Sequence, residues 1–213
     1  MKLTLLIILI NFLVFFISLS NPVFFIENYG FSPSRFLSGN YEIIVTSIFL
    51  HANFLHLLFN TISLFFLGAA LEKKINGLKY IFIYFLTGIF GNLAMCIPFL
   101  YNLNTIGIGA SGSISGLVGL GTFLYPGQLV VFQTIIPLPF VVVGALYFLT
   151  TSMNLFIPSN IAYPVHFISL ISGSLFGIFF SKSKKKKNIL IFILVLLLIT
   201  LLPYILRLII WVI

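Results

Sequence analysis

The sequence predicts an all-α protein that crosses a membrane several times. Of its 213 residues, 61% are apolar and only 7% are charged. Apolar runs long enough to form membrane-spanning helices recur along the chain, which is not typical of soluble domains. We therefore expect one polytopic helical domain over residues 1–213, with the lipid bilayer as its surroundings.

The first apolar run extends from Leu3 to about Leu19 and follows a charged start. A cleavable signal peptide has a similar pattern, but this run is long for a signal core and no A-x-A site follows it. We therefore expect a retained first helix. Residues 21–49 are interrupted by prolines and glycines and are rich in aromatic side chains, so we expect a loop with short helices in the membrane interface.

Six further segments have the length and composition of spans, although the fifth is short. We expect an interfacial connection over Gln128 to Pro139, and a loop over Met153 to Tyr163, between consecutive spans. The six expected spans are about His56–Leu71, Tyr80–Leu100, Ser111 to Pro126, Phe140–Ser152, Pro164–Phe180 and Ile189–Ile213.

The formal net charge of +8 would suggest a nucleic-acid partner in a soluble protein. Here the basic residues lie in short segments between apolar runs, so we expect a membrane surface and no nucleic acid. With a cytoplasmic N-terminus, only Arg35 and Arg207 lie on or near the outer side. The lysine run between the last two spans fits a stop signal or an anionic-lipid site. The lysines expected on the cytoplasmic side are Lys2, Lys73, Lys74, Lys79, Lys182, Lys184, Lys185, Lys186 and Lys187.

This orientation brings polar side chains of three helices to a similar depth near the outer side. Ser111 opens the fourth span, His166 lies in the sixth, and His56 and Asn60 share one face of the second. The N-terminus of a helix favours negative charge, and a serine becomes a nucleophile when a base takes its proton. We predict a catalytic pair of Ser111 and His166, with His56 and Asn60 as oxyanion donors. The alternative is a hydrogen-bonded patch between helices without chemistry.

Glycines provide a way to bring the fourth and sixth spans together. Gly112 and Gly116 are four residues apart, as are Gly173 and Gly177. Small residues at this spacing let two helix backbones approach closely. The pattern therefore predicts close packing, which by itself implies no chemistry.

The chain contains no Asp, and its only carboxylates are Glu27, Glu42 and Glu72. The last of these is expected at the opposite end of the second span from His56, so a Ser–His dyad is favoured over a triad. No H-E-x-x-H motif occurs, and the single Cys96 excludes a CxxC site and an intrachain disulfide. We expect no metal and no other cofactor.

These motifs resemble those of the rhomboid intramembrane serine proteases. The run from Gly109 through Ser111 to Gly116 is similar to their G-x-S-G-x-x-x-G motif. The run from His51 through His56 to Asn60 is similar to their H-x₄-H-x₃-N motif. His166 followed by Gly173 resembles their sixth-helix motif, and the resemblance covers about Thr46 to Gly177.

The resemblance implies a six-helix core over about residues 1–181, with about 189–213 as an added seventh transmembrane helix. It implies that Ser111 is the nucleophile and His166 the general base. His56, Asn60 and the backbone at Ser111 would form the oxyanion hole, with Gly109 beside it. The substrates would be transmembrane segments of other proteins in the cell membrane, cut near their outer ends. The loop over 153–163, with the fifth helix, would act as a gate.

Three positions depart from the family pattern. Ser169 replaces an expected glycine, and Ser115 stands where an aromatic side chain often packs against the base. The frequent Trp–Arg pair of the first outer loop is absent, because Trp211 is the only tryptophan. A catalytically inactive rhomboid-like protein that binds membrane clients is the alternative function. A transporter subunit is less favoured, because the polar residues gather at one depth.

Overall fold

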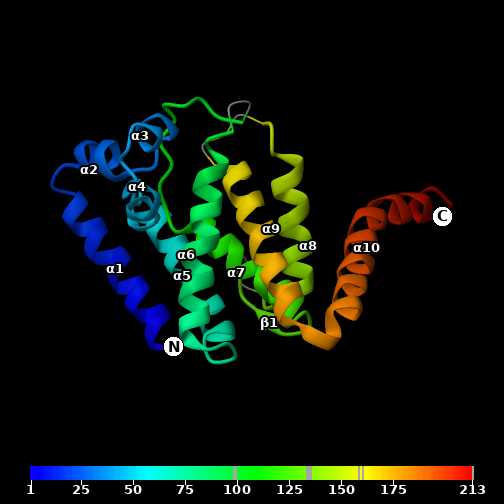
Figure 1. Cartoon of the computed structure of the whole chain (residues 1–213). Helices are drawn as coiled ribbons and strands as arrows, with labels where there is room; N and C mark the ends of the chain where they lie inside the picture. The colour runs from blue at the N-terminus through cyan, green and yellow to red at the C-terminus, as the bar shows by residue number, and fades with distance from the viewer. Residues whose placement is uncertain (98–99, 133–135, 158, 160, 213) are drawn as a thin grey trace.

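The helices of the computed structural model follow the apolar runs of the sequence, which confirms the all-α prediction (Figure 1). The structure describes residues 1–97, 100–132, 136–157, 159 and 161–212. The long helices are α1 (Lys2–Ser18), α5 (Phe54–Leu71), α6 (Gly77–Ala94), α7 (Ser111–Leu124), α8 (Phe140–Met153), α9 (Tyr163–Phe180) and α10 (Lys185–Val212).

The third span ends earlier than the sequence predicts. The predicted span reaches about Leu100, but α6 ends at Ala94. The backbone N–H groups of Met95, Cys96 and Ile97 each donate to the carbonyl three residues earlier. These bonds tighten the chain into turns, because a helix terminus leaves carbonyls that such contacts satisfy.

Three helices, α5, α6 and α9, are long and apolar enough to cross a membrane among the residues that the structure describes. Three shorter apolar helices, α1, α7 and α8, accompany them. The 14 residues of α7 rise only about 21 Å, less than the hydrocarbon thickness of about 30 Å. The first residue of α7 can therefore lie at membrane depth. A transmembrane role for α10 stays a prediction.

Short helices fill residues 21–49, as the sequence predicts. Their bounds are α2 (Pro22–Tyr29), α3 (Pro33–Leu37), α4 (Ile43–Thr46) and η1 (Ser47–Phe49). The Arg35 guanidinium donates to the backbone carbonyls of Glu27 and Asn28, and Phe31 pairs with Gly107 in an isolated bridge. The Arg35 bonds join α3 to α2 within the first loop, and the bridge joins this loop to the segment before α7, without a Trp–Arg pair. The position of these short helices in a membrane interface stays a prediction.

Two other connections carry short elements. In the segment 128–139, the two-residue strands β1 (Leu129–Val130) and β2 (Leu138–Pro139) pair antiparallel. Residues 133–135 of this predicted interfacial connection lie outside the described residues, as do 158 and 160 of the predicted gate loop. The 3₁₀ turn η2 (Lys182–Lys184) joins α9 to α10.

Helix α7 lies inside the bundle, and every residue from Gly112 to Phe123 is buried. Its closest neighbour is α9, where a Cβ on Gly173 would lie 1.9 Å from the carbonyl oxygen of Gly116. The predicted glycine faces therefore meet backbone to backbone. At the other end of α7, the Asn188 amide donates to the carbonyl of Phe123 at 2.7 Å and ties α10 to the bundle.

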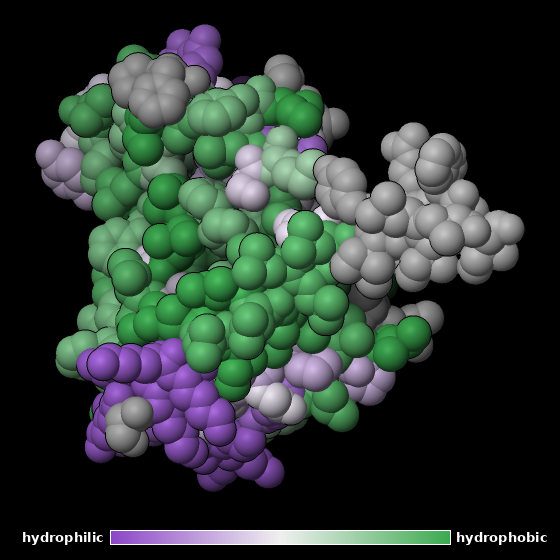
Figure 2. Space-filling view, turned by 90° about the vertical axis from the view of Figure 1, so that its right-hand side faces the viewer, coloured by the Kyte–Doolittle hydropathy of each residue, from purple (hydrophilic) through white to green (hydrophobic). Residues whose placement is uncertain are grey.

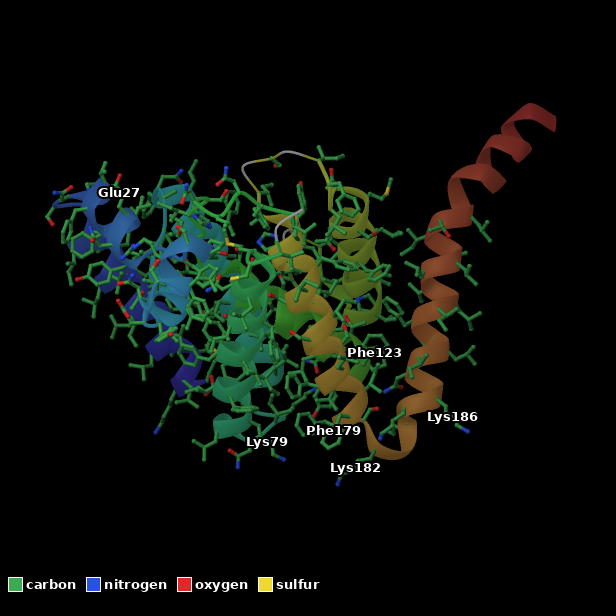
Figure 3. All side chains as sticks on the ribbon, turned by 45° about the horizontal axis from the view of Figure 1, so that its top comes forward. Glu27, Lys79, Phe123, Phe179, Lys182 and Lys186 are labelled. Carbon is green, nitrogen blue, oxygen red and sulfur yellow. The ribbon has the colours of Figure 1, made fainter. Side chains whose placement is uncertain are left out.

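The two ends of the bundle differ in charge. Figure 2 shows hydrophilic residues gathered at one end, below a broad apolar surface. Figure 3 shows Lys79, Lys182 and Lys186 at that end and Glu27 at the other, and all three lysines are exposed. The distribution agrees with the charge asymmetry expected of a chain inserted in one direction.

Glu72 joins α1 to α5 at the lysine-rich end. Its carboxylate, 8% exposed, accepts hydrogen bonds from the Leu3 N–H at 3.1 Å and the Thr4 N–H at 2.9 Å. It also accepts from the Thr4 hydroxyl at 2.6 Å and lies 2.9 Å from the Met1 amino group. Burial alone raises the pKa of Glu72, but the Thr4 hydroxyl, the amino group and the two N–H groups outweigh it and lower the pKa to about 2.

Glu72→Gln is therefore expected to lower the free energy of unfolding at pH 7 by about 1.5–3 kcal/mol, the range for hydrogen bonds to charged groups. Because the folded-state pKa lies below the ordinary value of 4.5, the carboxylate stabilises the fold fully above pH 4.5. That contribution is lost as the pH falls through about 2. Unfolding in detergent across this window should show the loss in the wild type and not in Glu72→Gln.

The exposed Glu42 provides the control, because Glu42→Gln removes a carboxylate outside this cluster. Equal stability of the Glu72→Gln and Glu42→Gln proteins would contradict the prediction.

Candidate active site

The structure brings Ser111 and His166 together. Ser111 is the first residue of α7. His166 lies in the first turn of α9, and Pro164 is the second residue of that helix. The His166 Nε2 atom lies 2.8 Å from the Ser111 Oγ atom, within hydrogen-bond distance. His166 is only 9% exposed, so the imidazole is held in a largely dry setting. This arrangement can transfer a proton from the hydroxyl to the imidazole.

A cavity of about 830 Å³ contains both side chains. One wall comes from α5 and includes Phe59 and Ile62, and another includes Tyr147 of α8. Val131 and Phe132, after β1, close a further side, and Ile106 to Ile108 also contribute. Most of the lining is apolar, which suits an apolar polypeptide segment better than a charged small molecule.

His56 and Asn60 lie on the same cavity wall, as their spacing predicts. The His56 Nδ1 atom accepts from the Ala52 N–H at 3.4 Å, so Nε2 carries the proton of the neutral ring. The Asn60 Nδ2 group is buried and has no hydrogen-bond partner in the described part of the chain. A buried donor without a partner is costly unless something else binds it. Both groups are therefore suited to hold an oxyanion beside Ser111.

Gly109 contributes space and backbone conformation. Its φ is +115°, a backbone angle that residues other than glycine rarely adopt. A Cβ at this position would lie 2.7 Å from the His56 ring. Its N–H group donates to the carbonyl of Ser47 at 2.9 Å, so the N–H is not a free oxyanion donor. The Ser111 N–H stands at the start of α7, where N–H groups have no acceptor within the helix.

The ring of His51 packs against the ring of His56. The two rings meet edge to face, with centroids 5.0 Å apart, and His51 Nδ1 donates to the Phe49 carbonyl at 3.1 Å. Burial, and after it the nearby His56, lower the pKa of His51, the Phe49 carbonyl opposes them, and the net result is a pKa of about 3. His51 is thus neutral at pH 7 and acts as a packed support.

Ser169 fits where a glycine was expected, because α6 has a glycine opposite it. The Ser169 hydroxyl donates to the Thr87 carbonyl at 2.9 Å, and a Cβ on Gly91 would lie 2.3 Å from that hydroxyl. Ser47 and Tyr147 also belong to the surroundings of the site, and the motifs of the sequence do not indicate them. A tyrosine within the apolar fifth span was the one available signal.

Carboxylates lie elsewhere in the structure. Glu72 is bound at the start of α1, and Glu27 lies on α2 at the edge of the molecule (Figure 3). Over the described ranges, no three His, Cys, Asp or Glu side chains group closely enough to hold a metal ion. Ser111, His166, His56 and Asn60 are the polar side chains of the cavity that the candidate chemistry uses.

Comparisons with known proteins identify a matching family model and several relatives of the chain. The family model of the rhomboid domain matches residues 38–183. The putative rhomboid protease YdcA of Bacillus subtilis (strain 168) is 37% identical over 87 residues, which are 41% of this chain and 43% of that protein. Rhomboid-like protease 1 of Toxoplasma gondii is 34% identical over 88 residues, 41% of this chain and 29% of that protein.

A relative described as inactive is equally similar. Inactive RHOMBOID-like protein 8 of Arabidopsis thaliana is 38% identical over 96 residues, 44% of this chain and 26% of that protein. The chain thus spans less than half the length of these relatives. Because the family model covers more than half of the chain, the chain belongs to the rhomboid family of multi-pass membrane proteins.

Proposed function

We propose that this protein is an intramembrane serine endopeptidase that cleaves transmembrane segments of other membrane proteins near their outer ends. The observation that carries the proposal is the 2.8 Å contact between His166 Nε2 and Ser111 Oγ in an apolar cavity. Relatives named as proteases support it. Together they favour peptide-bond hydrolysis by a Ser–His dyad without a cofactor.

The geometry supports a two-step reaction. His166 takes the proton of Ser111 Oγ as that oxygen attacks the scissile carbonyl carbon. The carbonyl oxygen becomes an oxyanion that His56, Asn60 and the Ser111 N–H stabilise. His166 then gives its proton to the leaving amine as the C–N bond breaks, which leaves an acyl-enzyme on Ser111. Water, deprotonated by His166, attacks the ester, and the second product leaves as Ser111 regains its proton.

The cavity lies between α5 and α8, and α5 exposes large apolar side chains beside it, among them Phe54, Leu55 and Phe59. A transmembrane helix of another protein can pack on such a surface before an unwound part enters the cavity. We therefore assign the substrates to the class of single membrane-spanning segments. The lysine-rich end would face the cytoplasm with the N-terminus, and the cavity would open toward the outer face of the cell membrane.

The second candidate is a catalytically inactive rhomboid-like protein that binds membrane clients. The similarity to Inactive RHOMBOID-like protein 8 favours it. The presence of both Ser111 and His166 at hydrogen-bond distance favours the protease.

The two functions are separated by purified protein in proteoliposomes with a panel of transmembrane substrates. The protease predicts new substrate fragments with the wild type, covalent labelling of the wild type by a fluorophosphonate, and neither with Ser111→Ala. Intact substrates that co-purify with an unlabelled wild type would instead support the client-binding protein. Cleavage that persists in Ser111→Ala would refute the dyad.

Asn60 provides a quantitative test of the oxyanion site. Asn60→Ala is expected to lower kcat about 10²- to 10³-fold with a smaller change in KM, because the donor acts on charge that appears in the transition state. Kinetics in proteoliposomes measure this split. Asn28→Ala, which alters an exposed asparagine of α2, is the control. A rise in KM with unchanged kcat would assign Asn60 to substrate binding instead.

A further inference from the structure

An aromatic ring from α8 lies against the imidazole of His166. The rings of Tyr147 and His166 are stacked, with centroids 6.3 Å apart and planes 29° from parallel. Offset stacking in this distance range stabilises pairs of aromatic rings. The contact joins the helix that lines the cavity to the helix that carries the imidazole.

The phenol of Tyr147 is fixed at its far end. Its oxygen lies 2.8 Å from Ser115 Oγ, and Ser115 Oγ donates its own proton to the Ser111 carbonyl at 2.7 Å. Since that proton is already used, Tyr147 must be the donor to Ser115. Phe132 packs against the Tyr147 ring edge-on, with centroids 5.3 Å apart. Hydrogen bond and ring contact together define where the ring lies.

Ser115 makes this arrangement possible. It lies one turn after Ser111 on α7 and is fully buried. Its small side chain leaves room for a ring from another helix and offers that ring an acceptor. The small residue at position 115 and the tyrosine at position 147 are thus complementary in size and in hydrogen bonding.

We infer that Tyr147 is the positioning residue of His166, and that it makes the orientation of the imidazole depend on the position of α8. The inference rests on the proposed function, in which His166 is the base. A displacement of α8 would carry the Tyr147 ring with it and change the surface against which His166 packs. The site therefore couples α8, one wall of the cavity, to the proton-transfer geometry at Ser111.

The test compares Tyr147→Leu, which removes the ring, with Tyr147→Phe, which keeps it. Phe148→Leu is the matched control, because Phe148 is the next residue of α8 and packs on Phe167 and Phe192. Tyr147→Leu is expected to lower kcat and the fluorophosphonate labelling rate about 10- to 100-fold, with KM within about twofold, because small misplacements of reacting groups are costly. Tyr147→Phe should restore most of the rate, and Phe148→Leu should match the wild type.

A second readout does not depend on catalysis. The chain has three histidines, so ring-labelled histidine gives a simple NMR spectrum in which His166→Ala assigns the His166 resonances. These resonances should move in Tyr147→Leu and stay in place in Phe148→Leu. Unmoved resonances, or equal kinetics in the two leucine variants, would overturn the inference. A wild type without cleavage or labelling would refute the proposed function, and the spectra alone would then decide the role of Tyr147.

Discussion

Ser111→Ala and His166→Ala are each expected to abolish cleavage, with losses of about 10⁴-fold or more, and the double variant should lose no more than either one. The physical reason is that the two groups act as one unit. The imidazole accepts the proton of the hydroxyl that lies 2.8 Å away, so removing either partner removes the activated nucleophile. Losses of this kind are strongly non-additive in serine hydrolases.

The measurement is the initial rate of substrate cleavage in proteoliposomes for the wild type, both single variants and the double variant. Ser172→Ala is the matched control, because Ser172 also lies on α9 but its hydroxyl bonds to the backbone carbonyl of Ser169. If the fold-loss of the double variant equals the product of the two single losses, Ser111 and His166 act independently, and the dyad is contradicted. A His166→Ala protein with full activity would require another base.

Gly173→Ala is expected to lower both stability and activity, because it acts on the closest approach of α7 and α9. A Cβ on Gly173 would lie 1.9 Å from the Gly116 carbonyl oxygen and 2.8 Å from its Cα. These are backbone atoms of a buried helix, so the two helices must separate. Overpacking of this kind costs about 1–3 kcal/mol and sometimes more. An increase of 1 Å in the distance between Ser111 and His166 is enough to lower the rate about 10²-fold.

Thermal unfolding in detergent and cleavage kinetics measure the two effects together. Gly127→Ala is the control, because a Cβ there meets nothing within 4 Å. Wild-type kinetics in Gly173→Ala would contradict the view that this backbone contact sets the distance between the nucleophile and the base. Loss of stability with unchanged kcat in the remaining folded protein would assign Gly173 to stability alone.

The Gly173 contact also explains how a chain with so few charged groups can hold Ser111 and His166 close together. The α7–α9 approach rests on glycine in both helices, and Ser169 occupies space left by Gly91 on α6. These contacts depend on close packing of small residues and not on ion pairs. Such packing suits a bilayer, where burying an isolated charge costs free energy. The carboxylate of Glu72 is the exception, and it lies at the lysine-rich end with its hydrogen bonds satisfied.

The class of fold, most of the helical segments and the family follow from the amino-acid sequence alone. Apolar runs and their proline and glycine boundaries are local signals, so the start of α7 at Ser111 and a start of α8 at about Phe140 could be predicted. The predicted third span runs past Pro98 to about Leu100, although a proline usually ends a helix at or before the preceding residue, and α6 ends at Ala94. The motif spacing also placed His56 and Asn60 on one face, since helical periodicity is local.

Which side chains from different helices meet depends on the packing of the folded bundle. The stacking of Tyr147 on His166 and the space for Ser169 opposite Gly91 depend on how each helix is rotated and how closely it crosses its neighbours. The use of the Gly109 N–H by Ser47 depends on the path of a loop. Periodicity says which residues share a face, but helix rotation and crossing are set by packing of the whole bundle. For that reason the sequence could name the residues of the candidate dyad but not the ring that lies against its imidazole.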